Sequence, residues 1–236
     1  MTRLRILVHA VFHDDQPRGV GRYAQELVRA YCYAFPGDAV AVVTGTWMSG
    51  YKWPTSAEVI PACGRRALIA RNLWNLSYDF GQLVHRVNPN LVHFCDTTPV
   101  PRCGRPTVST IHDLAEFHHT AKYGFLRSTI RRQVVGVQVR RSQSCITVSK
   151  VTRTQLAKMR APPSQVSVIP LASPFEKRPS YENAPCSPYV LYVGAVERAK
   201  NLTAHGTSVM HCFASGVQYS SSPIVPRFRN KDSLWK

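Results

Sequence analysis

The chain of 236 residues is long enough to bury roughly 70–75% of the surface that its unfolded form would expose, so it can hold a full globular domain. Its 44% hydrophobic and 18% charged residues exclude a disordered or fibrous chain, and no apolar run approaches the ~18–20 residues of a membrane-spanning helix. Thirty Lys and Arg against thirteen Asp and Glu give a net charge of +17, which favours nucleic acid, acidic membrane surfaces or phosphorylated small molecules as partners.

The cysteines and the N-terminus indicate a cytoplasmic protein. The seven cysteines are scattered, odd in number and free of any Cys-x-x-Cys pair, so we expect neither disulfides nor a metal site, and no cofactor. The apolar run at 4–11 follows two arginines, as in a signal peptide, but it leads into His and Asp without a small-residue cleavage pattern. We therefore interpret this run as a first strand and expect any membrane contact to be peripheral, at the inner face.

Strand-like and helix-like segments alternate along the chain as far as residue 171. Short runs rich in Val, Ile and Leu predict strands, and apolar residues at three- and four-residue steps predict helices. The strands are expected at 4–11, 39–44, 59–61, 91–95, 107–112, 145–149 and 165–171, and the helices at 21–35, 66–87, 125–142 and from Ser149 through Leu156. Continuous apolar strands that alternate with helices predict a doubly wound, Rossmann-like α/β fold around a parallel sheet.

Candidate functional residues follow the predicted strands. In doubly wound sheets, ligands gather at the carboxyl ends of the strands, where helix N-termini offer unpaired N–H groups. His112 and Asp113 end the strand at 107–112, and Ser149 ends the next strand. A buried strand rarely ends on an imidazole and a carboxylate unless both face a cleft, so we expect a ligand site at this edge of the sheet.

The C-terminal part of the chain has a different organisation. We predict an N-terminal domain at 1–172, followed by an interdomain linker at 173–187 that is rich in proline and shows no periodicity. Residues 188–202 predict the first strand and turn of a second Rossmann-like domain. Residues 203–236 show neither helix nor strand period, so we expect an atypical, poorly ordered tail.

Five segments in order resemble glycosyltransferases of family 4, which have the two-domain GT-B fold. The segments are RGVGRYAQELVRAY (18–31), TIHDLAEFHH (110–119), ITVSKVTRTQLAK (146–158), VSVIPLAS (166–173) and YVLYVGAVERAKNL (189–202). The resemblance implies transfer of a sugar from a nucleoside diphosphate sugar to a sugar or lipid-linked acceptor, with retention at the anomeric carbon and without a required metal. It also implies that the N-terminal domain mainly holds the acceptor, while the C-terminal domain mainly holds the donor.

The resemblance assigns roles to individual residues. It implies that His112 lies at the reaction centre, while Asp113 either orients it or caps the following turn. Ser149 either faces the cleft or only caps a helix, and Arg22 either faces the cleft or is a solvated charge. The residues implied to bind the donor phosphates are Gly19, Gly21, Arg198 and Lys200. Lys200 matches the lysine of the family, whereas Ala199 stands where many relatives have arginine, which displaces Arg198 by one position.

The sequence departs from the family in its second domain. Family members carry two glutamates in an E-x7-E motif that bind the donor, but Glu197 is the last glutamate of this chain. The pattern resembles an acceptor-side domain with the start of a donor domain and an unrelated tail. We therefore expect little or no sugar transfer by this chain alone, and we keep a noncatalytic sugar- or nucleotide-binding protein as the alternative.

The basic surplus has two further interpretations. Arginines concentrate on the predicted helix at 125–142, where a basic face could bind an anionic membrane surface or be merely solvated. These arginines are Arg127, Arg131, Arg132, Arg140 and Arg141. A nucleic-acid-binding protein is the weaker alternative, because no helix-turn-helix, zinc-finger or RNP-type pattern is present, so we expect no nucleic-acid partner.

Overall fold

The structure is a computed structural model that describes residues 3–64, 68–114, 117, 125–159 and 165–172, with the backbone alone at 68–71 and 127. The chain separates into two compact units, Met1–Pro179 and Ser180–Lys236. All described residues belong to the first unit. The predicted linker, second-domain start and tail lie outside the described residues.

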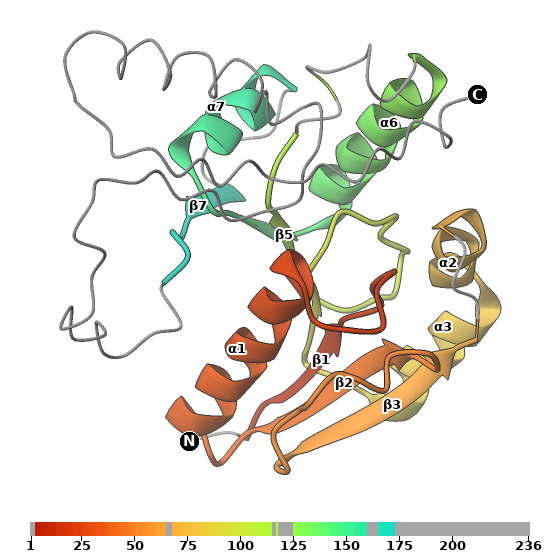
Figure 1. Ribbon diagram of the computed structural model, residues 1–236, viewed down its shortest axis with the longest axis vertical. Helices are drawn as coiled ribbons and strands as arrows, with labels where there is room; N and C mark the ends of the chain where they lie inside the picture. Colours follow the sequence, from red (N-terminus) through yellow and green to blue (C-terminus); the bar gives the residue numbers. More distant parts are fainter. Residues whose placement is uncertain (1–2, 65–67, 115–116, 118–124, 160–164, 173–236) are drawn as a thin grey trace, which may run out of the picture. The chain divides into compact units, whose positions relative to one another are not determined.

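Seven strands form one parallel sheet (Figure 1). Its order is β3-β2-β1-β4-β5-β6-β7, and every neighbouring pair is parallel. The strands are β1 (Arg5–His9), β2 (Ala39–Gly45), β3 (Ala57–Cys63), β4 (Leu91–Phe94), β5 (Thr107–Ile111), β6 (Ser144–Thr147) and β7 (Val166–Val168). The predicted α/β fold is therefore confirmed.

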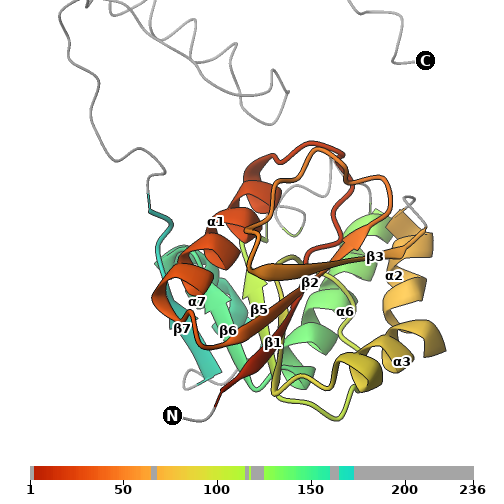
Figure 2. The same ribbon diagram turned by 90° about the horizontal axis from the view of Figure 1, so that it is seen from below.

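Helices cover both faces of the sheet, and Figure 2 shows α1 on one side with α2, α3 and α6 on the other. The described helices are α1 (Gly19–Ala34), α2 (Leu68–Asn75), α3 (Tyr78–Val87), α6 (Phe125–Arg141) and α7 (Lys150–Lys158). Successive side chains of β1 point to opposite faces of the sheet. Ile6 and Val8 therefore pack with Val28 of α1, while Leu7 packs with Phe80 of α3. Since both faces are covered, the strands are apolar on both sides.

The strand order places a topological switch point at one edge of the sheet. After β1 the chain adds β2 and β3 on one side, and it then returns to add β4 to β7 on the other side of β1. Connections therefore leave the carboxyl ends of β1 and β4 in opposite directions. Ligands of doubly wound proteins bind at such a switch point, which here is bordered by the loops that follow β1, β4 and β5.

The predicted helix at 66–87 is wrong in one respect, because the structure contains two helices there. The chain turns after α2, where the Ser77 N–H and its hydroxyl both donate to the Trp74 carbonyl, at 2.9 and 2.7 Å. Asn75 is fully buried, and its side chain accepts a 2.8 Å hydrogen bond from His9 Nε2. This contact fixes the end of α2 against β1, and a second helix then begins after Ser77.

Strand boundaries also differ from the predictions. β3 spans Ala57–Cys63 rather than 59–61, because it pairs with β2 along almost its whole length. β7 ends at Val168, whereas the strand was expected to reach 171, and Leu171 is exposed. Short-range patterns locate these strands, but the pairing with the neighbouring strand sets where they end.

Candidate functional site

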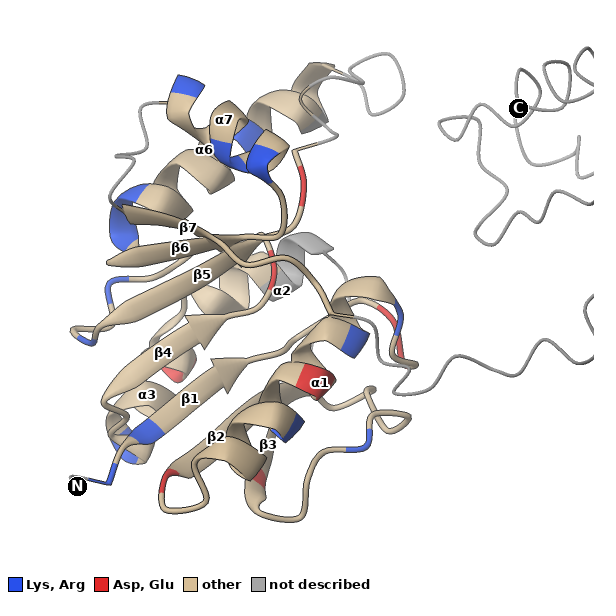
Figure 3. Cartoon of the chain, turned by 90° about the vertical axis from the view of Figure 1, so that its left-hand side faces the viewer, with Lys and Arg blue, Asp and Glu red and all other residues tan. Residues whose placement is uncertain are grey.

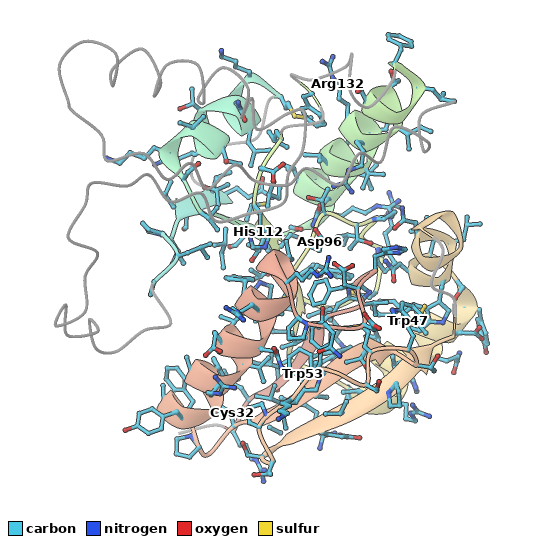
Figure 4. All side chains as sticks on the ribbon, viewed as in Figure 1. Cys32, Trp47, Trp53, Asp96, His112 and Arg132 are labelled. Carbon is cyan, nitrogen blue, oxygen red and sulfur yellow. The ribbon has the colours of Figure 1, made fainter. Side chains whose placement is uncertain are left out.

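The candidate site lies at the carboxyl edge of the sheet, beside the switch point. Figure 4 shows His112 and Asp96 next to one another near the N-terminal end of α1. His112 directly follows β5, while Cys95 and Asp96 directly follow β4. The side chains of β4 and β5 are nearly all buried, yet both strands lead into polar residues, Asp96 and His112, at the same edge of the sheet.

The His112 side chain is half-buried and held in one orientation. Its Nε2 donates a 3.0 Å hydrogen bond to the Cys95 carbonyl. Because a carbonyl oxygen only accepts, Nε2 must carry the proton, which leaves Nδ1 as the acceptor of the neutral ring. None of the described residues bonds to Nδ1. Within the described residues, this atom therefore keeps its lone pair for a hydroxyl group of a ligand.

Three side chains joined by hydrogen bonds, those of Tyr23, Thr110 and His93, form a polar chain that supports the His112 ring. Tyr23 of α1 meets the ring edge to face, with centroids 4.7 Å apart. The Tyr23 hydroxyl lies 3.0 Å from Thr110 Oγ1, which in turn lies 2.9 Å from His93 Nε2. Burial raises the pKa of Tyr23 to about 12, so its hydroxyl stays protonated. The chain therefore links α1 and the two central strands directly beneath the imidazole.

His93 is the charge-sensitive member of this chain. Burial, together with the nearby His112, lowers the pKa of His93 to about 4. The ring is therefore neutral near pH 7, and its hydrogen bond with the Thr110 hydroxyl places no charge in the core.

Asp113 follows His112 in the sequence, and Ser149 is connected to the His112 backbone through Thr152. Asp113 is exposed at the end of β5. Ser149 caps α7, since its Oγ accepts a 3.1 Å hydrogen bond from the Thr152 N–H. The Thr152 hydroxyl then donates to the His112 carbonyl at 3.3 Å. The helix-cap interpretation of Ser149 is thus confirmed, and the cap ties the start of α7 to the end of β5.

The N-terminus of α1 opens at the same edge. Gly19 begins the helix with φ +33°, a backbone conformation that favours glycine, and no atom lies within 4 Å of a Cβ built there. The first turn holds no acidic residue, and Arg22 is exposed. The Gly21 N–H donates to the Arg18 carbonyl, so the N–H groups of Gly19 and Val20 and the positive end of the helix dipole are the features of this turn that suit an anion.

Gly21 has a different environment from Gly19. It is buried, and a Cβ at this position would overlap the Tyr51 hydroxyl and lie 2.9 Å from two carbons of the ring. Tyr51 is itself held in a stack between Phe12 and Trp53, with centroids 5.9 Å apart on each side. The structure therefore gives Gly21 a packing role between α1 and the segment that follows β2.

Replacing Gly21 with alanine is expected to lower the free energy of unfolding by about 1–3 kcal/mol, because Tyr51 must leave its stack to admit the methyl group. Urea denaturation measures the loss. Combining the change with Tyr51→Phe removes the overlapping hydroxyl and should recover part of it. The matched control Gly81→Ala, where α3 has open space, should not destabilise the protein. Equal losses at both glycines would contradict the packing role.

The predicted basic face on α6 is wrong as a single face. Arg131 and Arg141 donate to the carbonyls of Thr97 and Val100, at 2.9 and 2.7 Å, and so hold the connection between β4 and β5 against the helix. Arg132 lies over the Phe117 ring and donates to the Phe117 carbonyl, whereas Arg140 is exposed in the last turn.

The arginines of α6 also point in different directions. Residues 131 and 140 are nine positions apart, so they lie on opposite sides of a helix with 3.6 residues per turn. The Arg127 side chain lies outside the described part of the structure.

Several residues of the site were not found from the sequence. They are Tyr23, His93, Cys95, Asp96 and Thr110. The strands did carry a signal, because His93 and Thr110 are polar side chains within apolar runs and lie on the same face as Cys95 and His112 by two-residue alternation. Tyr23 gave none, since its position on α1 is that of an ordinary core residue.

Two of the predicted phosphate-binding residues, Arg198 and Lys200, lie outside the described residues. Among the residues that the structure describes, no group of three or more His, Cys, Asp or Glu side chains is placed to hold a metal ion.

Comparison with known proteins identifies a family. The model of Glycosyltransferase Family 4 matches residues 17–172, which include the N-terminus of α1, the polar chain beneath His112 and all of the strands from β2 to β7. No curated protein matches the chain.

Proposed function

Because the chain belongs to Glycosyltransferase Family 4, we propose that residues 1–172 form the acceptor-side domain of an enzyme that transfers a hexose from a nucleoside diphosphate sugar. The transfer retains the anomeric configuration, and the acceptor is a saccharide or a lipid-linked saccharide. The family match and the polar edge of the sheet support this proposal.

The position of His112 carries the proposal. Its Nε2 donates to the Cys95 carbonyl, and no described residue bonds to its Nδ1, which is proposed to face the ligand at the switch point. A neutral Nδ1 accepts a hydrogen bond from a sugar hydroxyl, and a protonated ring stabilises the negative charge that develops as the diphosphate departs. In either protonation state the ring is fixed before the substrate binds, so little ordering is needed at the moment of reaction.

The diphosphate of the donor is proposed to lie near the N-terminus of α1. The open backbone at Gly19 allows close approach, and the first-turn N–H groups attract its charge. Arg198 and Lys200 are proposed to neutralise the same diphosphate from the second domain, as the family resemblance implies. Arg22, which is exposed in the first turn, is a further candidate partner of the phosphates.

The 236-residue chain by itself is expected to release nucleoside diphosphate from nucleotide sugars only at the background rate. No glutamate follows Glu197, so the chain lacks the pair that holds the donor in the family. An assay of nucleoside diphosphate release detects turnover whether the sugar passes to an acceptor or to water. Nucleoside diphosphate release at the rate of an active family member would refute this expectation.

A chimera tests the function itself. Residues 1–172 are joined to the donor-binding domain of an active family member with a known donor, and nucleoside diphosphate release from that donor is measured. We expect release well above that of the isolated donor domain, because the chimera has both walls of the cleft. If the chimera binds the donor in calorimetry but does not release nucleoside diphosphate, the alternative of a noncatalytic binding protein holds.

We also propose peripheral membrane contact through the N-terminal half of α6. Phe125, Leu126 and Ile130 are exposed there, at 83%, 73% and 54%, and Arg132 is exposed on the same helix. None of the described helices is long and apolar enough to cross a membrane. Vesicles that contain anionic lipid should sediment the wild-type protein, and Phe125→Ser/Leu126→Ser should weaken sedimentation at least severalfold. Sedimentation that is unchanged in the variant would remove this proposal.

A further inference from the structure

A concave site lies at the edge of the sheet opposite to the candidate site, where β5 begins. Its volume is about 740 Å³, which is in the range of small-molecule sites. Arg102 and Arg105 line it from the connection between β4 and β5, and Arg140 and Arg141 line it from the last turn of α6. Figure 3 shows Lys and Arg positions gathered at the end of the sheet where β5 and β6 begin. We name this site the arginine cleft.

Two of the four guanidinium groups are anchored by the protein. Arg141 donates one N–H to the Val100 carbonyl at 2.7 Å, and Arg105 donates one to the side-chain oxygen of Asn88. Each guanidinium group has five N–H donors, so both keep further donors for a ligand. Anchored side chains lose less conformational entropy when a ligand binds.

The charge of the arginine cleft is not balanced by nearby carboxylates. Among the described residues, no acidic side chain lines it, and none of its four arginines forms an ion pair with a described carboxylate. The C-terminal dipole of α6 gives a structural reason for Arg140 and Arg141, since cations stabilise the end of a helix. It gives no reason for Arg102 and Arg105, which come from a different segment. Four like charges around one cavity repel one another unless an anion lies between them.

The arginine cleft is separate from the candidate site at the carboxyl edge. Thr107, which lines the cleft, is the first residue of β5, while His112 follows the last. Five residues of extended strand at about 3.3 Å each place the two about 17 Å apart. The role of the cleft therefore does not depend on the proposed sugar transfer.

We propose that the arginine cleft binds a ligand that carries two adjacent phosphate groups. Guanidinium groups bind phosphate oxygens through paired N–H donors, and here they come from two walls, so that one phosphate can lie against each wall. The ligand is either a soluble diphosphate or the diphosphate head group of a lipid, since both present the same chemistry.

Calorimetry with inorganic pyrophosphate tests this proposal on the full 236-residue chain. We expect one molecule to bind per chain, more tightly than orthophosphate. The variant Arg102→Gln/Arg140→Gln takes one arginine from each wall, neither of which is an anchored one, and should weaken binding at least tenfold. The matched control Arg29→Gln/Arg153→Gln removes the same charge from exposed positions on α1 and α7, and it should change binding less than twofold. Thermal unfolding confirms that both variants are folded.

The outcomes separate the arginine cleft from general charge attraction. Equal weakening in both double variants, or unchanged binding in the Arg102→Gln/Arg140→Gln variant, overturns the proposal, as does the absence of pyrophosphate binding. Neutral vesicles doped with a diphosphate lipid then distinguish the sources. If the protein sediments with these vesicles, if the Arg102→Gln/Arg140→Gln variant does not, and if pyrophosphate prevents the sedimentation, the ligand is a lipid head group. If the protein does not sediment with them, the ligand is a soluble diphosphate.

Discussion

Replacing His112 with alanine is expected to lower the turnover number of the chimera by about 10²–10³-fold. That range is the typical effect of removing one group that hydrogen-bonds or transfers a proton in the transition state. The Michaelis constant for the donor should change much less, because the imidazole is proposed to act mainly as charge develops on the departing diphosphate. Nucleoside diphosphate release over a range of donor concentrations separates the two constants.

Two further substitutions at this position separate the roles of the ring nitrogens. His112→Gln can still donate to the Cys95 carbonyl but has no group at the position of Nδ1, so it should fold normally and be as inactive as the alanine variant. His112→Asn places an amide near the position of Nδ1 and should retain part of the activity. The control His85→Ala changes an exposed histidine of α3 and should have no effect on turnover. Full activity of His112→Gln would show that Nδ1 does not contact the reacting groups.

Acidification is expected to destabilise the domain through His93. The pKa of this ring is lowered from 6.5 to about 4 in the folded protein, whereas the unfolded chain titrates near the ordinary value. Between these two values the unfolded state binds more protons than the folded state, so the free energy of unfolding decreases as the pH decreases. Above the ordinary value both states are neutral and His93 adds no pH dependence. From about pH 7 to about pH 4.5, the contribution of His93 to the loss is roughly 2 kcal/mol.

The His93→Gln variant isolates this contribution from that of the carboxylates. Glutamine retains a side-chain amide that can bond to Thr110, but it cannot take up a proton. Urea denaturation at a series of pH values should give a flatter decrease of unfolding free energy for His93→Gln than for the wild type. The control His85→Gln should keep the steeper wild-type decrease. Parallel curves for His93→Gln and the wild type would mean that His93 does not titrate in this way.

Local patterns in the sequence were sufficient for the outline of the fold. Two-residue and 3.6-residue periodicities act over a few neighbouring positions, so they revealed the alternation of strands and helices and the parallel sheet. The same logic placed His112 at the carboxyl end of a strand, and it offered a helix cap as one of two roles for Ser149, a role that the structure confirms. The positive charge and the absence of glutamate after Glu197 are properties of the sequence alone.

Contacts between distant segments were decided only by the tertiary structure. The last residue of α2, Asn75, is bound by His9, which lies 66 positions away in the sequence. Gly21 is needed because Tyr51, thirty positions later, packs against it.

The arginine cleft and the chain beneath His112 likewise bring together groups from separate elements. Each set combines residues from segments that are far apart in the sequence, so a local pattern can mark single members, such as His93 or Arg140, but not the group. Periodicity determines which face of a helix or strand is buried. The packing of one element on another determines which side chains come into contact, and these contacts form the sites.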